Sequence, residues 1–457
     1  MKVPAEIFRA YDIRGIVGKT LTSAVAHAVG QALGSLGRER GAATFALGRD
    51  GRHSGPMLLD ALAAGLTAAG ADVVDLGIAP TPVTYFAAFH LGCASCVSVT
   101  GSHNPPEYNG LKMVVGGTTL SGEAIQQLRA RIESDDVASG TGKRTQAAVI
   151  DAYLARILGD VKLARGMKIA IDCGNGVAGL VAPRLFRALG CEVEELYCDV
   201  DGSFPNHHPD PSHLENLADL IAALRRGGAE LGLAFDGDGD RLGVVTHDGE
   251  VIFPDRQLML FAADVLARNP GAEIIYDVKS TRLLAPWIEQ HGGRPLIWKT
   301  GHSFIKAKLA ESGAPLAGEM SGHTFFKERW YGFDDALYAG ARLLEILSKT
   351  PDASAALKAL PNAPSTPELQ WKLAEGEPHA LVEKLQAAKP FPNAERVLTI
   401  DGVRAEYADG FGLARASNTT PVIVLRFEAE TEAALKRIQE EFRSALAPLK
   451  PAAPLPF

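Results

Sequence analysis

The segment Lys168-Ile169-Ala170-Ile171-Asp172 is an apolar run that ends in an aspartate, and it begins the pattern that indicates the fold. A helical stretch between Leu180 and Leu189 follows it, and after Gly190 a second run, 192–196, closes the unit. A strand, an amphipathic helix stopped at a glycine and another strand are the parts of a βαβ unit. The segment therefore predicts two parallel strands joined by a helix.

Two other segments repeat this pattern at well-separated places, one over residues 44–76 and one over residues 273–298. In each, a run that ends in an aspartate (Asp50 or Asp277) is followed by a helical stretch, a glycine and a second run. A βαβ unit used three times predicts three similar α/β domains, which we expect to contain mixed sheets.

The last part of the chain follows a different pattern. Runs at 396–400 and 403–407 flank an Asp-Gly turn, and 422–425 predicts a further strand. We expect a small α+β domain on an antiparallel sheet, after a proline-rich linker at 361–367 and before a frayed tail from Pro448. A final helix is expected to place one apolar face on the sheet, made by Leu435, Ile438, Phe442 and Ala445.

At 457 residues the chain is too long for one compact core. The patterns above place domain boundaries that give four domains, 1–150, 151–253, 254–364 and 365–457. The composition is 46% apolar and 22% charged, which is typical of a soluble globular protein. A formal net charge of −8 argues against a general binder of nucleic acid or of membrane surfaces.

Targeting signals and cysteines favour a cytoplasmic protein. The first residues lack the apolar core of a signal peptide, and no apolar stretch approaches the length of a membrane span. Five cysteines, an odd count, fit a reducing compartment. Cys93 and Cys96 have CxxC spacing, but they lie in an apolar run without a second pair, so we expect ordinary buried thiols.

An acidic turn between two apolar runs is the first candidate site. Asp236, Asp238 and Asp240 alternate with glycines and precede Arg241. Three carboxylates at this spacing repel one another unless they share a cation, and hard oxygen ligands suit Mg²⁺. A solvated acidic turn is the alternative. An EF-hand does not fit, because Arg241 stands at the sixth loop position and His247 at the twelfth.

A serine loop follows the apolar run 96–99. Ser102 and His103 offer a hydroxyl and an imidazole on a polar turn, as a nucleophile requires. A hydrolase nucleophile elbow would need glycines where Thr100 and Asn104 stand. Taken alone the loop could equally be a structural Asx/Ser turn. Arg14 and Lys112 are unremarkable singly, since most such residues solvate a surface.

Three further loops contain polar side chains of the kinds that bind ligands. Residues 299–303 follow a strand of the third unit, and residues 318–323 combine the carboxylate of Glu319 with the hydroxyl of Ser321, which suits adjacent sugar hydroxyls. A turn with a satisfied histidine is the alternative for both. Residues 415–421 gather a guanidinium, hydroxyls and an amide, the composition of a phosphate nest. The sequence contains no Walker A motif, so a nucleotide cofactor is unsupported.

Taken together, these stretches resemble the α-D-phosphohexomutase family, most closely its bacterial phosphomannomutase/phosphoglucomutase members. The resemblance runs in order over almost the whole chain, through 11–15, 100–105, 236–241, 318–323 and 415–419. It implies three similar α/β domains and a fourth of another class around a central active-site cleft. The implied activity is reversible transfer of a phosphoryl group between positions 1 and 6 of mannose or glucose phosphates.

The resemblance also implies roles for individual residues. Ser102 would be the phosphoserine, and Asp236, Asp238 and Asp240 would hold Mg²⁺ with a phosphoserine oxygen. Lys112 or His103 would act as the base, and the sequence leaves the choice open. Arg14 and Arg241 would lie near the transferring phosphate. The implied substrate-binding residues are Tyr11, Lys279, Thr300, Gly301, His302, Glu319, Ser321, His323, Arg415, Ser417, Asn418 and Thr419.

The implied cycle uses glucose 1,6-bisphosphate or mannose 1,6-bisphosphate as activator and no macromolecular partner, with the chain as a monomer or a dimer. A phosphoglucosamine mutase is one alternative, although such enzymes usually carry Gln where Met320 stands. A metal-dependent sugar phosphatase with an aspartate nucleophile in Asp236-Gly237-Asp238 is another. A non-enzymatic binding protein for Ca²⁺ or sugar phosphates is the third.

Overall fold

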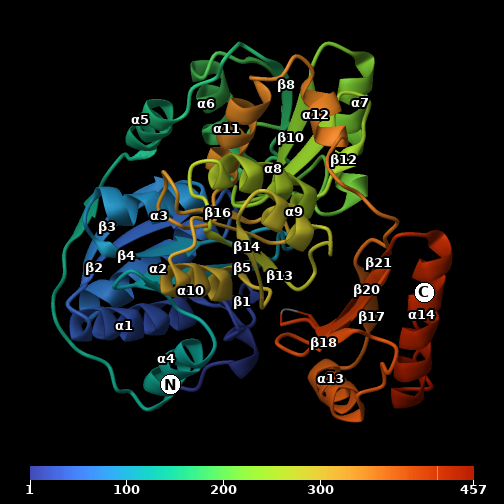
Figure 1. Cartoon of the computed structure of the whole chain (residues 1–457). Coiled ribbons are helices and arrows are strands. Elements are labelled where there is room, and N and C mark those ends of the chain that lie inside the picture. The colour runs from blue at the N-terminus through green and yellow to red at the C-terminus, as the bar shows by residue number, and fades with distance from the viewer. Residues whose placement is uncertain (419) are drawn as a thin grey trace.

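The computed structural model describes residues 1–418 and 420–457. The chain passes through four sheets in succession, and the last of them lies at one side of the molecule with its own helices (Figure 1). The fold class predicted from the sequence, three mixed-sheet α/β units followed by an α+β unit, is confirmed.

The first sheet has seven strands. Strand β2 pairs in parallel with β3 and β4, and β3 pairs in parallel with β7, whereas β5 pairs antiparallel with β1 and β4, so the sheet is mixed. Its strands are β1 (Ile13–Ile16), β2 (Thr44–Arg49), β3 (Asp72–Ile78), β4 (Ala94–Val99), β5 (Tyr108–Val115), β6 (Thr118–Thr119) and β7 (Arg144–Gln146). The accompanying helices are η1 (Ala5–Ile7), α1 (Ser23–Glu39), α2 (Gly55–Ala68), α3 (Thr81–His90) and α4 (Glu123–Glu133).

The second sheet has five strands in the order β12-β11-β10-β8-β9. Strands β9, β8 and β10 are parallel, and β11 and β12 are antiparallel additions. The strands are β8 (Lys168–Asp172), β9 (Glu192–Leu196), β10 (Leu231–Phe235), β11 (Leu242–Thr246) and β12 (Val251–Ile252). The helices are α5 (Ile150–Asp160), η2 (Val177–Leu180), α6 (Ala182–Ala188), η3 (Leu214–Leu217) and α7 (Ala218–Arg226).

The third sheet has four strands in the order β14-β13-β15-β16, of which only the β15–β16 pair is antiparallel. The strands are β13 (Glu273–Asp277), β14 (Arg294–Trp298), β15 (Leu316–Gly318) and β16 (Thr324–Phe326). The helices are α8 (Pro254–Leu266), α9 (Leu284–Gln290), α10 (His302–Ser312), α11 (Ala336–Leu347) and α12 (Ala353–Lys358).

The three predicted βαβ units are β2-α2-β3, β8-α6-β9 and β13-α9-β14, and each joins two parallel strands. Each helix ends just before a glycine with positive φ: Gly70 (82°), Gly190 (97°) and Gly292 (77°). A glycine adopts this left-handed conformation without a Cβ penalty, which is why it stops the helix.

The fourth sheet is antiparallel throughout, in the order β17-β21-β20-β19-β18. The expected apolar face of the last helix is present, with Leu435, Ile438 and Phe442 buried on the sheet, although Ala445 is only half-buried. The elements are β17 (Leu369–Lys372), α13 (Glu377–Ala388), β18 (Arg396–Leu398), β19 (Val403–Tyr407), β20 (Gly410–Ala416), β21 (Val422–Ala429), α14 (Glu432–Leu446) and η4 (Ala447–Leu449).

The expectation of a frayed tail is wrong. Leu449, Leu455 and Phe457 pack against the core of the fourth unit, and the Phe457 ring lies 4.8 Å from the Phe427 ring between centroids. Apolar residues spaced among the prolines give the tail enough surface to bury. Among the described residues, no helix combines the length and apolar character that crossing a bilayer needs.

The second and third sheets share one hydrophobic core. Helices α11 and α12 follow the third sheet in sequence but contact β11 of the second (Figure 1). His247 N donates to Ser354 Oγ at 2.9 Å, and Lys162 N donates to Glu345 Oε1 at 3.1 Å, which ties both helices to the second unit. This packing fixes the second and third units relative to each other, so loops from both can build one site.

Candidate active site

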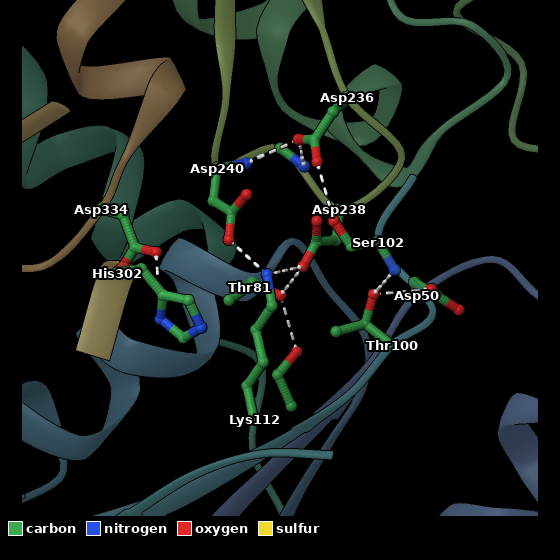
Figure 2. Close-up of polar contacts among 12 residues, drawn as sticks. Asp50, Thr81, Thr100, Ser102, Lys112, Asp236, Asp238, Asp240, His302 and Asp334 are labelled. Atoms are coloured by element: carbon green, nitrogen blue, oxygen red, sulfur yellow. Dashed lines mark hydrogen bonds and ion pairs between the residues drawn. The ribbon is translucent and has the colours of Figure 1, made fainter. Parts of the chain in front are cut away.

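Loops at the carboxyl ends of strands from three sheets meet at one place, where α/β proteins commonly bind ligands. The loops after β4 and β10 contact each other through Ser102 and Asp236, with Ser102 Oγ donating to Asp236 Oδ2 at 3.0 Å (Figure 2). Arg241, at the end of the acidic turn, places its Nε 3.3 Å from His323 Nε2 of the third unit. The serine loop and the acidic turn therefore form one site.

Ser102 is buried and held in an unusual backbone conformation. Its φ is +49°, a left-handed value that is uncommon for residues other than glycine, Asn and Asp. Its N–H donates to Thr100 Oγ1 at 2.7 Å, and its Oγ lies 3.0 Å from His103 Nδ1. Strained residues of this kind cluster at functional sites. The backbone aims the Ser102 hydroxyl at the acidic turn and at the imidazole together.

The acidic turn is organised by Asp236. Its Oδ1 accepts hydrogen bonds from the backbone N–H groups of Gly239, Asp240 and Arg241 at 3.0, 3.0 and 3.1 Å. These bonds close the turn between β10 and β11, while Oδ2 remains for Ser102. The alternative of a solvated acidic turn does not fit the structure, because Asp236, Asp238 and Asp240 are all fully buried.

Lys112 reaches the turn from β5 of the first sheet. Its Nζ donates to Asp238 Oδ2 at 2.7 Å and also to Asp240 Oδ2 (Figure 2). Thr81 Oγ1 donates to the same Asp238 oxygen at 2.5 Å. These contacts join the first sheet to the second across the site.

Burial and mutual repulsion perturb the carboxylates. Burial, together with the charges of Asp238 and Asp240, raises the pKa of Asp236 well above its ordinary value. Although burial opposes ionisation, Lys112 and His323 hold the pKa of Asp240 well below its ordinary value. Crowded carboxylates of this kind are stabilised by a shared cation.

The residues of the acidic turn fit a divalent metal ion. One ligand atom from each of Asp236, Asp238 and Asp240 lies within 4.8 Å of the others. Asp238 Oδ1 is buried and has no hydrogen-bond partner among the described residues. A buried, unpaired carboxylate oxygen is costly unless it binds a cation, and an all-oxygen set is the donor chemistry that Mg²⁺ prefers.

The two candidate bases lie in different electrostatic surroundings. Although burial disfavours its charge, the carboxylates of Asp238 and Asp240 raise the pKa of Lys112. Burial, reinforced by the charge of Arg241, lowers the pKa of His103 well below its ordinary value. The surroundings thus favour a charged Lys112 and a neutral His103 imidazole.

Arg14 braces the serine loop. Its Nη1 donates to Gly101 O at 2.7 Å and to the side chain of Asn104, and its Nη2 pairs with Asp12. Arg14 Nε is buried and has no partner among the described residues. The guanidinium is therefore fixed beside Ser102 with one donor unused.

The loops of the third unit form a hydrogen-bonded group around Glu319. Glu319 Oε1 accepts from Gly301 N at 2.5 Å, and its Oε2 lies 3.0 Å from His323 Nδ1. Ser321 Oγ lies 3.2 Å from the same nitrogen. Although burial opposes protonation, Asp240 and Glu319 raise the pKa of His323 to about 9. The predicted turn thus places a carboxylate, a hydroxyl and an imidazole together.

A second group of predicted residues surrounds Tyr11. Asn418 Nδ2 donates to Tyr11 OH at 2.7 Å, and the Tyr11 ring contacts the His302 ring edge-on with 6.0 Å between centroids. Arg415 Nε and Thr300 N both donate to Asp401 Oδ2, at 3.1 and 2.9 Å. Residues from the first, third and fourth units therefore meet here.

Lys279 and Ser417, two further predicted residues, have contacts of their own. Lys279 Nζ donates to Glu368 Oε1 at 2.5 Å, which joins the third and fourth units. Ser417 N donates to Val422 O at 2.9 Å and begins the tight loop of the fourth unit. Thr419 lies outside the described residues.

Sequence reasoning missed the residues that hold the serine loop. Arg52 is almost fully buried, and its guanidinium donates to four backbone carbonyls of this loop, those of Ser102, Asn104, Pro105 and Tyr108, at 2.8, 2.5, 2.6 and 3.0 Å. Asp50 accepts from Arg52 Nε at 3.2 Å, from Thr100 Oγ1 at 2.8 Å and from Gly101 N at 3.0 Å. The aspartate at the end of the first βαβ strand was the available signal, since polar groups at strand ends often serve a site.

The cysteines carry no second site of the kind their spacing suggests. Cys93 and Cys96 are buried free thiols, as expected from the sequence. Burial raises the pKa of the Cys96 thiol to about 12, so it is a poor nucleophile.

Comparisons with known proteins agree with this geometry. Family models described as phosphoglucomutase/phosphomannomutase alpha/beta/alpha domains I, II and III and C-terminal domain match residues 5–139, 151–249, 253–363 and 368–445. A phosphoglucomutase of Neisseria gonorrhoeae is 59% identical over 97% of each chain. A phosphomannomutase/phosphoglucomutase of Pseudomonas putida is 55% identical over 100% of this chain and 98% of its own.

A solved structure extends the likeness to the whole fold. The crystal structure of a phosphoglucomutase/phosphomannomutase family protein from Burkholderia thailandensis has a TM-score of 0.95 and 60% sequence identity, with 100% of both chains covered. The resemblance inferred from the motifs is thereby confirmed. The chain belongs to the phosphoglucomutase/phosphomannomutase family.

Proposed function

We propose that this protein interconverts hexose 1-phosphates and 6-phosphates of glucose and mannose through a phosphoserine at Ser102. The observation that carries the proposal is the contact between Ser102 Oγ and Asp236 Oδ2 at 3.0 Å. It places a hydroxyl that can bear a phosphoryl group directly on a three-carboxylate cation site. The names of relatives that are 55 to 59% identical support this function.

Ser102 begins the cycle as a phosphate donor. A sugar hydroxyl at carbon 1 or 6 attacks the phosphorus and gives up its proton, and the bond from phosphorus to Ser102 Oγ breaks. Ser102 Oγ takes up a proton through the neighbouring His103 Nδ1, 3.0 Å away, and a hexose 1,6-bisphosphate is left in the site. Mg²⁺ held by Asp236, Asp238 and Asp240 would neutralise charge on the transferring group. Arg14 and Arg241 flank the same place and bind the equatorial oxygens.

Ser102 then becomes the acceptor. After the bisphosphate turns over, Ser102 Oγ attacks its other phosphate and must lose a proton. We assign His103 to take that proton, because its Nδ1 lies 3.0 Å from Ser102 Oγ. Lys112 Nζ is engaged with Asp238 and Asp240, so its role is to hold charge in place.

The loops around Tyr11 bind the rest of the substrate. Arg415 Nη2 is buried and has no hydrogen-bond partner among the described residues, so it is available to the non-reacting phosphate. Ser417, Asn418 and Thr419 complete that phosphate site. Glu319 and Ser321 bind sugar hydroxyls. The other residues that line the substrate site are Tyr11, Lys279, Thr300, Gly301, His302 and His323.

The geometry disfavours Asp236 as the nucleophile of the phosphatase alternative. A nucleophilic Asp236 would need a free oxygen, whereas its Oδ1 accepts three backbone N–H groups and its Oδ2 accepts from Ser102. Phosphoryl chemistry at Ser102 leaves those hydrogen bonds to Oδ1 intact.

Several finer assignments belong to the same proposal. The domains are 1–150, 151–253, 254–364 and 365–457, arranged around the substrate site. The enzyme is cytoplasmic and acts as a monomer or a dimer on small sugar phosphates, with Mg²⁺ and with glucose 1,6-bisphosphate or mannose 1,6-bisphosphate as activator.

The direct test is an assay of the purified protein with Mg²⁺ and a trace of glucose 1,6-bisphosphate. Conversion of glucose 1-phosphate and of mannose 1-phosphate to the 6-phosphates is expected, without release of inorganic phosphate. Steady phosphate release would favour the phosphatase, and turnover of glucosamine phosphate alone would favour a phosphoglucosamine mutase. Binding without turnover would contradict an enzyme.

A further inference from the structure

Two cysteine thiols lie in contact at the carboxyl ends of two neighbouring strands of the second sheet. Cys173 follows β8 and Cys198 lies just beyond β9, and these strands pair in parallel. The two Sγ atoms are 3.6 Å apart, although 25 residues separate the cysteines in the chain. Both thiols are free in the structure. The sequence gives no local sign of this contact.

The backbone holds the two thiols at a spacing that a disulfide can bridge. Paired strands lie about 4.7–4.9 Å apart, within the range of about 4.4–6.8 Å between Cα atoms that disulfides span. Cys173 N donates to Leu196 O at 3.1 Å, so the pairing of the strands continues to Cys173 itself. A Cβ atom added at Gly179 would lie 1.9 Å from Cys198 O, so the two loops touch.

The two thiols differ in their access to solvent. Cys173 is fully buried, whereas Cys198 is only half-buried. The contact with Cys198, together with burial, raises the pKa of the Cys173 thiol well above its ordinary value. A small oxidant in solution therefore reaches the sulfur of Cys198 first. An accessible cysteine beside a resolving cysteine is a common arrangement in redox-sensing proteins.

We propose that Cys173 and Cys198 form a redox-modification site at which hydrogen peroxide converts the two thiols to a disulfide. The Cys198 sulfur attacks a peroxide oxygen, the O–O bond breaks, and the leaving hydroxide forms water with the thiol proton. The Cys173 sulfur then attacks the sulfenic acid, the S–S bond forms, and the S–O bond breaks to release a second water. The two thiols lose two electrons and the peroxide gains them.

The loop that carries Cys173 lies against the acidic turn. Val177 N donates to Gly237 O at 3.1 Å, and a Cβ atom added at Gly176 would lie 2.9 Å from Gly237 Cα. A disulfide bond of about 2.05 Å draws the sulfur atoms together by about 1.5 Å. A shift of this loop therefore reaches Gly237, on which the serine loop rests.

The loop that carries Cys198 lies against a support of the serine loop. A Cβ atom added at Gly202 would lie 2.5 Å from Gly51 O and 2.7 Å from Arg52 Cα. Arg52 in turn donates to Ser102 O at 2.8 Å. The disulfide thus joins two loops that touch both halves of the site. It is expected to lower turnover, and this consequence rests on the proposed function.

The test treats the reduced full chain with a small excess of hydrogen peroxide and maps its peptides without reduction. A peptide pair linked through Cys173 and Cys198 is expected, with loss of two hydrogen atoms from the intact chain and reversal by dithiothreitol. The kcat of the oxidised enzyme is expected to fall at least about tenfold and to return on reduction.

Two variants are the controls. Cys198→Ala is expected to form no linked peptide and to keep its kcat under the same treatment. Cys93→Ala leaves the proposed pair intact and is expected to respond as the wild type does. Far-UV circular dichroism checks both variants, and Cys198→Ser takes the place of Cys198→Ala if that variant does not fold.

Three outcomes would overturn the proposal. Sulfinic acid on Cys198 beside a free Cys173 thiol would show that the two sulfurs do not join. A link between Cys93 and Cys96, or between two chains, would place the reaction elsewhere. A linked enzyme with unchanged kcat would contradict the effect on the site. The peptide map needs no activity, so failure of the mutase assay would leave it unchanged and the two proposals fail separately.

Discussion

Ser102 and Asp236 are hydrogen-bonded at 3.0 Å although 134 residues separate them in the chain. The backbone sets this contact. A Cβ atom added at Gly237 would lie 2.4 Å from Ser102 O, closer than real Cβ contacts come. The serine loop therefore rests directly on the glycine of the acidic turn, and the two reacting parts of the site have a fixed separation.

Gly237→Ala is expected to lower kcat by about 100-fold or more, because misplacing reacting groups by about 1 Å has an effect of that size. The added methyl group pushes Ser102 away from the carboxylates while their chemistry is unchanged. Steady-state kinetics with glucose 1-phosphate measures the effect.

Gly159→Ala is the matched control for this substitution. Gly159 lies in α5, and a Cβ there would meet no atom within 4 Å. It is expected to keep full activity and to gain about 0.5–1 kcal/mol of helix stability. Equal activity of the two variants would contradict a fixed contact between the loops.

Arg52→Ala is expected to lower kcat by about 10- to 100-fold with a smaller change in KM, as removal of a supporting residue commonly does. The variant leaves the carbonyls of the serine loop without their shared donor, so Ser102 loses its orientation. Arg131→Ala, which removes surface ion pairs with Glu39 and Asp136, is the control. An unchanged kcat in Arg52→Ala would show that the loop holds itself.

Asp335 provides a pH-dependent test of stability. It is fully buried, and burial raises its pKa to about 7 even though Tyr338 N, Tyr153 OH and Trp330 Nε1 donate to it. Because the folded pKa exceeds the unfolded value of 3.8, the contribution of Asp335 to the free energy of unfolding depends on pH. It is complete below about pH 4 and is lost as the pH rises to about 7. The loss is on the order of 4 kcal/mol.

Asp335→Asn does not titrate, so the stability of the wild type is expected to fall relative to this variant between pH 4 and pH 7. Urea unfolding of both proteins at several pH values measures the difference. Asp352→Asn, which exchanges the exposed aspartate that caps α12, controls for replacing an aspartate N-cap by asparagine. A constant gap between wild type and Asp335→Asn would contradict the raised pKa.

Tyr11→Phe tests the meeting of the first and fourth units. The variant leaves Asn418 Nδ2 without its acceptor at 2.7 Å, which costs about 1–3 kcal/mol when the site is closed on substrate. A rise in KM of about 5- to 100-fold, with a smaller change in kcat, follows from that cost. Tyr407→Phe removes a similar hydroxyl contact, to Glu441 within the fourth unit, and is expected to leave KM unchanged.

The fold could be predicted largely from local signals. Apolar runs ending at Asp172 and Asp277, helices stopped at Gly190 and Gly292, and the change of pattern after residue 361 are readable in short windows. The crossing of α11 and α12 onto the second sheet was not predictable, because their apolar faces do not specify which sheet covers them.

The chemistry of the site could be predicted only where several reactive groups share one loop. The carboxylates of the acidic turn lie together in the sequence, whereas Arg52 and Asp50 bind groups of the serine loop that are about 50 residues away. A single arginine or aspartate at a loop has no local feature that separates it from a surface residue. Burial and partners, which only the folded chain shows, identify these two residues.

The most direct measurement of the central claim is phosphopeptide mapping after incubation with labelled glucose 1,6-bisphosphate and Mg²⁺. We predict one phosphate on Ser102, no label in Ser102→Ala and loss of mutase turnover in that variant. Label on the peptide that contains Asp236, or undiminished turnover by Ser102→Ala, would contradict a phosphoserine mechanism.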